Sequence, residues 1–217
     1  MKGDHPSLRA ERGNLIVLLA LAGELPRSKD LVGIAKKAHY IIAADGAYAK
    51  LKEVSVTPHL TLGDFDSLKK LPTDCKTKKF PAEKDKTDGE LALEEALQLK
   101  PAKTIIVGFF GGREDHVLGH YALMQKFAHE TEIEIIGNDF TLYVVTQHKK
   151  LMGKIGDRVS LVTLNSDGAT VSTTGLKYTL SHEKILPSSL GLSNEISDED
   201  FSVHVHQGIL FLFHYLT

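Results

Sequence analysis

The feature that most constrains the fold is an alternation of short apolar runs with helical patterns up to about residue 147. The runs at 15–22, 39–44 and 104–108 each end at or beside a glycine or an aspartate, as buried strands do where they leave a sheet. Such alternation with short connections predicts an α/β fold: a doubly wound, mostly parallel sheet with helices on both faces. The predicted strands are 15–22, 39–44, 60–62, 78–80, 104–108, 132–136 and 140–145, and the predicted helices are 29–38, 47–54, 88–99 and 117–130.

The pattern changes after residues 147–150. Short strand-like runs follow, separated by glycine, serine and asparagine, and no helical pattern lies between them. This is typical of a small all-β, sandwich-like domain. We therefore predict an α/β domain over residues 1–148 and a β domain over residues 149–217. The strand-like runs of the second domain are 158–164, 169–172, 179–180, 201–206 and 208–214.

Composition narrows the function classes. The formal net charge of −2 and the lack of a lysine- and arginine-rich stretch argue against a nucleic-acid partner. Cys75 is the single cysteine, so internal disulfides are excluded and a reducing cytoplasm is compatible. The basic N-terminus before run 15–22 superficially matches a signal peptide, but the run is too short to cross a bilayer and Gly23 follows it. We read it as a first buried strand, and expect a cytoplasmic protein without membrane contact.

Two carboxylates follow the apolar run 60–62 directly. Asp64 and Asp66 are two residues apart, and in a continuing strand both would point the same way. Ligands of open α/β sheets bind beyond the carboxyl ends of the strands. Oxygen-rich clusters without cysteine suit Mg²⁺ shared with substrate phosphates. The alternative is a loop in which one aspartate caps a turn and the other is solvated.

Further acidic or glycine-rich motifs occur along the α/β domain. Asp45-Gly46 ends the run 39–44, where Asp45 could bind a metal or hydroxyl, or only cap a helix. In Lys84-Asp85-Lys86-Thr87-Asp88, Thr87 or Asp88 could cap the helix 88–99, while Asp85 or Asp88 faces the site. In Gly111-Gly112-Arg113-Glu114-Asp115-His116, the glycines could turn backbone N–H groups toward a phosphate. The planar guanidinium group of Arg113 could bind two oxygens of that phosphate. Asp115 could cap the helix or orient His116.

Taken in order, these motifs resemble the thiamin pyrophosphokinase family, and the resemblance covers almost the whole chain. It extends to Gly23-Glu24-Leu25-Pro26 after the first strand, Gly63-Asp64-Phe65-Asp66-Ser67, Thr174-Gly175-Leu176-Lys177-Tyr178 and Gly191-Leu192-Ser193-Asn194-Glu195. The resemblance implies Mg²⁺-assisted transfer of the pyrophosphoryl group of ATP to the hydroxyl of thiamin, giving thiamin diphosphate and AMP. It also implies a homodimer with an active site shared between subunits, the β domain helping to hold thiamin.

The resemblance also implies roles for individual residues. The catalytic set is Asp64, Asp66, Asp88 and Arg113, and the metal ligands are Asp64, Asp66 and Asp88. The expected ATP-binding residues are Asp45, Gly46, Asp85, Thr87, Gly111, Gly112, Arg113, Asp115 and His116. The expected thiamin-binding residues are Asp88, Tyr178, Ser193 and Asn194. Tyr178 would supply an aromatic face and Asn194 would pair with ring nitrogens.

The chain departs from the family pattern at two places. Ala47, Tyr48 and Ala49 stand where the family usually has a second glycine and then an asparagine, so we expect a narrower approach for the nucleotide. Tyr178 stands where tryptophan is common and offers less stacking area. Two other functions are compatible with an acidic cleft: a Mg-dependent diphosphokinase for another alcohol, and a non-catalytic sensor of nucleotide or thiamin diphosphate.

Overall fold

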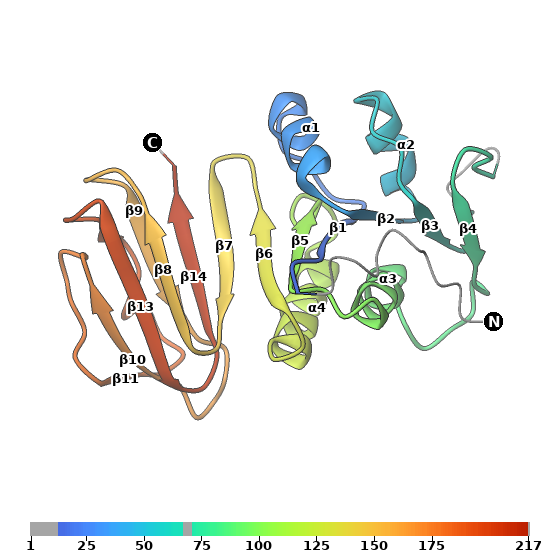
Figure 1. Cartoon of the computed structure of the whole chain (residues 1–217). Helices are drawn as coiled ribbons and strands as arrows, with labels where there is room; N and C mark the ends of the chain where they lie inside the picture. Colours follow the sequence, from blue (N-terminus) through green and yellow to red (C-terminus); the bar gives the residue numbers. More distant parts are fainter. Residues whose placement is uncertain (1–12, 67–70, 217) are drawn as a thin grey trace. The chain divides into compact units, whose positions relative to one another are not determined.

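The computed structural model describes residues 13–66 and 71–216 (Figure 1). The basic N-terminal residues and Ser67 of the acidic motif lie outside the described residues. The chain divides into two compact units between Asn138 and Asp139. No helix within the described residues is long and apolar enough to cross a membrane.

The first unit is built on a parallel sheet in the order β6-β5-β1-β2-β3-β4. Its central strand β1 is buried on both sides, as expected of a parallel sheet covered by helices. Leu18 of β1 lies opposite Ile41 on one neighbour and Ile105 on the other. The strands are β1 (Ile16–Ala20), β2 (Tyr40–Ala44), β3 (Leu60–Gly63), β4 (Lys76–Lys79), β5 (Lys103–Val107) and β6 (Glu132–Ile136).

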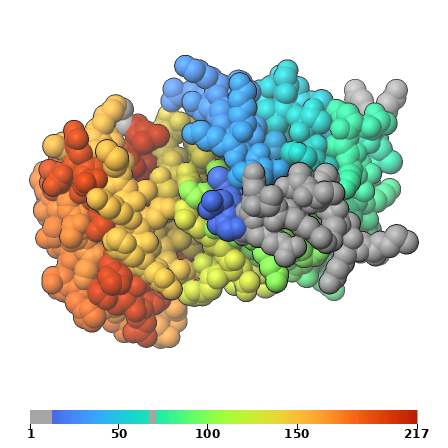
Figure 2. Space-filling view, viewed as in Figure 1, coloured from blue at the N-terminus to red at the C-terminus, as the bar shows by residue number. Residues whose placement is uncertain are grey.

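Helices cover both faces of this sheet. In Figure 1, α1 (Ser28–Lys37) and α2 (Ala47–Glu53) lie on one face, and α3 (Asp88–Gln98) and α4 (Glu114–Phe127) lie on the other. Leu31 of α1 and Leu51 of α2 are fully buried against Leu18 and Ile105 of the sheet. The outer surfaces of α1 and α2 are visible together in the space-filling view (Figure 2). The doubly wound α/β fold predicted from the sequence is thus confirmed.

The second unit is all β. One sheet has the order β12-β9-β14-β7 and the other has the order β11-β10-β13-β8, with antiparallel pairs throughout. A core of buried side chains, including Leu161, Val171, Val203 and Leu212, fills the unit. The strands are β7 (Phe140–Val145), β8 (His148–Met152), β9 (Arg158–Val162), β10 (Ala169–Thr174), β11 (Glu183–Ile185), β12 (Asn194–Glu195), β13 (Asp200–Gln207) and β14 (Leu210–Tyr215).

Three details of the second unit differ from the sequence analysis. Strand β7, assigned to the parallel sheet, pairs antiparallel with β14, so the compact unit begins ten residues earlier than the expected boundary at 148/149. Strands β8, β11 and β12 were not expected, because these short strands are made mostly of polar residues and carry little apolar signal. The run 179–180 is not a strand.

Candidate active site

Three carboxylates converge beyond the carboxyl ends of β2 and β3. Asp45 follows β2, Asp64 follows β3 and Asp88 begins α3, and one ligand atom from each lies within 4.8 Å of the other two. Gly63 makes this approach possible: its φ is +152°, and a Cβ there would lie 2.9 Å from the Cβ of Asp45. We call Asp45, Asp64 and Asp88 the acidic trio.

Asp66 does not belong to the acidic trio. Strand β3 ends at Gly63, and the buried Phe65 has a φ of +63°, so the chain turns instead of continuing as a strand. The backbone N–H of Asp66 donates to Asp64 Oδ1 over 3.1 Å, and the Asp66 side chain is exposed. The premise that Asp64 and Asp66 point the same way from an extended strand is therefore wrong. Asp45, for which both a metal-binding and a capping role were open, lies with Asp64 and Asp88.

The ammonium group of Lys84 lies between two members of the trio. It is 3.3 Å from Asp88 Oδ1 and 3.6 Å from Asp64 Oδ2, and it donates to the carbonyl of Pro81 over 2.9 Å. The Lys84 side chain is only 14% exposed. Lysine is therefore the resident cation of the acidic trio in this structure.

Burial and like charge leave the trio electrostatically strained. Burial raises the pKa of the Asp88 carboxyl above its ordinary value, and the Asp64 and Asp45 charges raise it further, against the lowering effect of Lys84. Asp88 Oδ1 is inaccessible to solvent and accepts no hydrogen bond. The Lys84 ammonium lies 3.3 Å from this oxygen as an ion-pair partner. A site of this kind favours a cation of higher charge.

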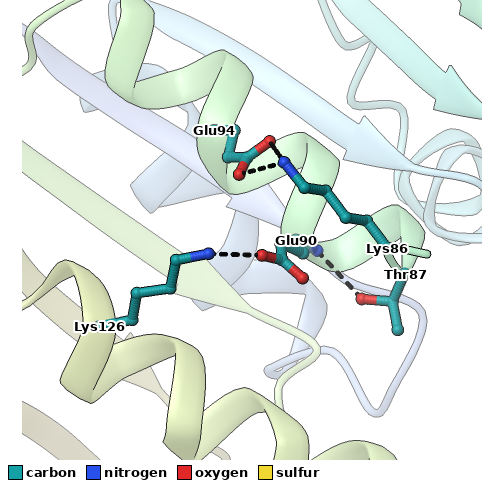
Figure 3. Close-up of polar contacts among 5 residues, drawn as sticks. All are labelled: Lys86, Thr87, Glu90, Glu94 and Lys126. Atoms are coloured by element: carbon teal, nitrogen blue, oxygen red, sulfur yellow. Dashed lines mark hydrogen bonds and ion pairs between the residues drawn. The ribbon is translucent and has the colours of Figure 1, made fainter.

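Local interactions fix the start of α3, and with it Asp88. Thr87 is the N-cap: its Oγ1 accepts the backbone N–H of Glu90 over 3.1 Å, as the sequence predicted (Figure 3). Lys126 of α4 donates to Glu90 over 2.8 Å, and Lys86 donates to both carboxylate oxygens of Glu94 (Figure 3). These contacts stabilise the first turns of α3 and connect the helix to α4, so the position of Asp88 is fixed.

A cavity of about 290 Å³ opens beside the acidic trio, entirely within the first unit. Its lining includes Asp45 and Asp88 of the trio, Thr87 and the turns that follow β1 and β5. These two turns run so close that only glycine fits between them. A Cβ on Gly108, whose φ is +70°, would lie 2.1 Å from the carbonyl oxygen of Leu21. The cavity is thus walled in part by bare backbone, which can approach a phosphate closely.

Lys50 of α2 holds the turn after β1. Its ammonium donates to the carbonyls of Ala22 and Gly23 over 2.6 and 2.7 Å, and both of these residues line the cavity. The sequence analysis did not single out Lys50, because its partners are 27 and 28 residues away along the chain.

The glycine-arginine-histidine motif opens α4 at the cavity. Gly112, Arg113 and His116 line it, while Gly111 and Asp115 do not. The Arg113 guanidinium donates to both oxygens of Asp115, and this pair lowers the pKa of the Asp115 carboxyl. Asp115 also accepts the backbone N–H of His116. Asp115 thus orients Arg113 and the first turn of α4, in place of the expected contact with the His116 ring.

His120 and the Phe109-Phe110 pair form the inner wall of the cavity and were not predicted to bind ATP. The His120 Nδ1 atom is 3.3 Å from the Phe109 carbonyl, and the His120 ring packs against the Phe109 ring at 5.1 Å. Burial lowers the pKa of His120, so this imidazole is neutral near neutral pH. The sequence signal that could have identified it is its spacing of four residues from His116, which places both on one face of α4.

The departure at Ala47 does not narrow the cavity. Ala47 is fully buried and belongs to the core beneath α2, and it does not line the cavity. The side chain of Tyr48 donates to Asp74 over 2.8 Å, which raises the Tyr48 pKa to about 12. The expected steric effect on the nucleotide is therefore not supported.

In the second unit, Asn194 holds Tyr178. The Asn194 side chain donates to the Tyr178 carbonyl over 2.8 Å and accepts the Tyr178 N–H over 3.0 Å and the Glu195 N–H over 2.8 Å. Asn194 is 5% exposed, whereas Tyr178 is 63% exposed, with the Lys177 ammonium 5.9 Å from its ring centroid. The Asn194 amide thus holds the backbone around Tyr178, and its direct pairing with ring nitrogens stays a prediction. Ser193 is exposed, and its N–H donates to Ser160.

The structure thus brings together only part of the predicted set. Asp45, Thr87, Asp88, Gly112, Arg113 and His116 meet at the cavity, with Asp64 beside them in the trio. Gly46, Asp85, Gly111 and Asp115 lie outside the cavity lining. Lys84 was not predicted to belong to the site, although its spacing of four residues from Asp88 is the signal that could have identified it.

A parallel α/β sheet with clustered carboxylates and a glycine-walled cavity at its strand ends is typical of enzymes that act on phosphate compounds. Comparison with known proteins makes this specific. The family model of the thiamin pyrophosphokinase catalytic domain matches residues 32–136, and that of the thiamin pyrophosphokinase vitamin B1 binding domain matches residues 144–210. The two matches fall on either side of the division between Asn138 and Asp139.

Individual relatives agree. Thiamine pyrophosphokinase of Bacillus subtilis (strain 168) is 30% identical over 194 residues, which cover 84% of this chain and 90% of the relative. A crystal structure of thiamine pyrophosphokinase from B. subtilis superimposes with a TM-score of 0.82 at 25% identity, over 93% of this chain and 99% of that one. The structure from Geobacillus thermodenitrificans gives 0.78 at 26% identity, over 94% and 98%. The chain belongs to the thiamin pyrophosphokinase family, and the enzyme class predicted from the sequence is confirmed.

Proposed function

We propose that this enzyme transfers the pyrophosphoryl group of ATP to the hydroxyl of thiamin in the cavity beside the acidic trio, with Mg²⁺ as cofactor. The observation that carries the proposal is the convergence of Asp45, Asp64 and Asp88 within 4.8 Å next to a cavity walled by glycine backbone and Arg113. Family membership supplies the substrates and the reaction.

The residues present fit a hard divalent cation. Their donors are carboxylate oxygens, the ligand type that Mg²⁺ takes, and a buried Asp88 oxygen lacks a hydrogen-bond donor. The three carboxylates of the acidic trio would hold the ion. Asp66, which was also predicted as a ligand, lies beyond the turn at Phe65. We propose that it contacts the ion through a water molecule or after a local movement of this turn. When bound, Mg²⁺ neutralises charge on the triphosphate and helps to hold it in line for attack.

The reaction joins the thiamin oxygen to the β-phosphorus of ATP and breaks the bond from that phosphorus to the oxygen that leaves with AMP. Arg113, held by Asp115, stabilises negative charge that builds on the phosphate oxygens. Asp88 is the proposed acceptor of the hydroxyl proton, because its carboxylate borders the cavity in which the hydroxyl would lie. A metal bound by the trio would take the place of the Lys84 ammonium, which would then supply a further positive charge near the phosphates.

Thiamin recognition is assigned to the second unit. Tyr178 offers an exposed aromatic face to a flat ring, and Asn194 fixes the backbone that carries it. Ser193 adds an exposed hydroxyl. We further propose a homodimer in which each active site takes Tyr178 from the partner. The exposed Leu186, Leu190 and Leu192 give the second unit apolar surface for such an interface. The cytoplasmic location remains a prediction that rests on the single cysteine.

The test is AMP release from Mg-ATP with and without thiamin, with the products identified by mass. The proposal expects thiamin-dependent AMP together with thiamin diphosphate. Nucleotide hydrolysis that is indifferent to thiamin would reassign the acceptor alcohol. Tight nucleotide binding without turnover on any alcohol would instead identify a sensor.

The shared site has its own test. Mixing chains with Asp64→Asn and chains with Tyr178→Ala should restore part of the activity if each site draws on two subunits. No recovery in proven heterodimers would show that each site is built within one chain.

A further inference from the structure

Four imidazoles gather on the outer face of a sheet in the second unit, among residues that the proposed reaction does not use. His204 and His206 lie on β13, His148 on β8, and His182 just before β11. The ring centroids of His204 and His206 are 4.2 Å apart, and those of His182 and His206 are 4.4 Å apart. His148 is farther away, at 5.9 Å from His204.

Strand geometry creates this cluster. Along β13, Phe201, Val203 and Val205 are buried in the core of the unit, so the alternate residues His204 and His206 point to solvent. Their side chains are therefore not needed to stabilise the core.

Ser172 of the neighbouring β10 brings His182 into the group. Its Oγ accepts the backbone N–H of His182 over 2.9 Å and is hydrogen-bonded to His206 Nε2 at 2.8 Å. One hydroxyl thus holds a loop histidine beside a strand histidine 24 positions further along the chain.

The surroundings of His206 favour its neutral form, which is the form of imidazole that binds metals. Partial desolvation lowers the pKa of His206, and the neighbouring His204 and His182 lower it further. The ligand set is made of nitrogen atoms, unlike the oxygen set of the acidic trio. Imidazole groups select Zn²⁺, Ni²⁺ and Cu²⁺ over Mg²⁺.

We propose that His182, His204 and His206 form a surface site for a divalent transition-metal ion, separate from the acidic trio. In the structure the His204 and His206 rings are inclined by only 30° and lie against each other, so binding requires them to turn about their side-chain torsions until their nitrogens converge. Both side chains are exposed and can turn without disturbing the core. His148 lies at the edge of the site and contributes less.

The experiment is calorimetric titration of the full chain with Zn²⁺ in the presence of saturating Mg²⁺, which occupies the acidic trio. The Asp64→Asn variant serves as a second background in which the trio is weakened. We expect Zn²⁺ binding that His206→Ala weakens by about tenfold or more, since even outer contacts of a metal site are worth that much. The double variant His204→Ala/His206→Ala should abolish it.

Matched controls separate the site from general histidine binding. His129→Ala, an exposed histidine beyond the end of α4, should leave Zn²⁺ affinity unchanged, and His148→Ala should weaken it less than His206→Ala. In a histidine NMR spectrum, Cu²⁺ should broaden the His182, His204 and His206 ring signals first. Equal Zn²⁺ affinity in wild type and the double variant, or no Zn²⁺ binding by wild type, would overturn the proposal, with unchanged melting temperatures showing that the variants are folded.

Discussion

Replacing Lys84 by methionine tests the idea that a lysine occupies the acidic trio until a divalent cation displaces it. Lys84→Met keeps the length and packing of the side chain but removes its charge. The ammonium lies 3.3 Å from Asp88 and 3.6 Å from Asp64, and it is largely shielded from solvent. The substitution should tighten Mg²⁺ binding, but it should lower the stability of the metal-free enzyme and its turnover.

The first effect is on Mg²⁺ affinity. Two unit charges about 4 Å apart interact by about 1 kcal/mol even in water, so a divalent ion near the ammonium is repelled by about 2 kcal/mol. Removing the ammonium should therefore tighten Mg²⁺ binding to the nucleotide-free enzyme by about 30-fold. Calorimetric titration with Mg²⁺ alone measures this directly.

The second effect is on stability and turnover. Without metal, Lys84→Met leaves the trio uncompensated, and we expect a loss of roughly 1–3 kcal/mol in the free energy of unfolding, which Mg²⁺ restores. Turnover should fall, because the charge proposed to act near the phosphates is gone. Thermal unfolding with EDTA and with Mg²⁺ checks the first statement, and AMP release checks the second.

Lys86→Met is the matched control. Lys86 lies two residues away, but it pairs with Glu94 on the flank of α3 and not with the trio (Figure 3). It should change neither Mg²⁺ affinity nor turnover. If Lys84→Met binds Mg²⁺ no more tightly than wild type and is equally stable in EDTA, Lys84 is not the resident cation of the site.

Three further predictions concern Asp66, Asn194 and His120. Asp66→Asn should leave the fold intact and lower turnover by about 10²-fold or more, the scale of a lost transition-state contact. If the variant keeps wild-type turnover, the Asp66 side chain has no role in catalysis and only its backbone N–H contacts Asp64. Asn194→Ala should cost roughly 1–3 kcal/mol of stability and raise the KM for thiamin while leaving that for ATP unchanged, which steady-state kinetics and urea unfolding can measure. His120→Asn should flatten the acid dependence of stability: the lowered pKa of His120 means that the unfolded chain takes up the proton first, so stability is lost as pH falls below about 6.5. If the variant loses as much stability as wild type between neutral and acidic pH, His120 is not a buried neutral imidazole.

The sequence predicted the first unit well because its physics is local. Buried parallel strands read as continuous apolar runs, and the helix at 88–99 carries both its apolar spacing and its Thr87 cap in sequence. Asp45 and Asp64 were recognisable because each directly follows such a run. Carboxyl ends of neighbouring parallel strands lie at one edge of a sheet, so their convergence follows from the topology.

Other features depend on backbone conformation or on distant partners. The left-handed turn at Phe65, which separates Asp66 from the trio, has no periodic signal. Lys50 reaches carbonyls in the turn after β1, and Asn194 holds a backbone segment 16 residues away. Strand β7 reads as an apolar run like those before it, and only its antiparallel partner β14 assigns it to the second unit.

The central claim is that the acidic trio binds the catalytic metal and the phosphates of ATP. The most direct measurement is anomalous diffraction from crystals grown with Mn²⁺, thiamin and an ATP analogue that cannot transfer its pyrophosphoryl group. We expect a Mn²⁺ peak within coordination distance, about 2 Å, of oxygens of Asp45, Asp64 and Asp88, with the Lys84 ammonium displaced from between Asp64 and Asp88. A metal bound elsewhere, with Lys84 still between Asp64 and Asp88 in the nucleotide complex, would contradict it.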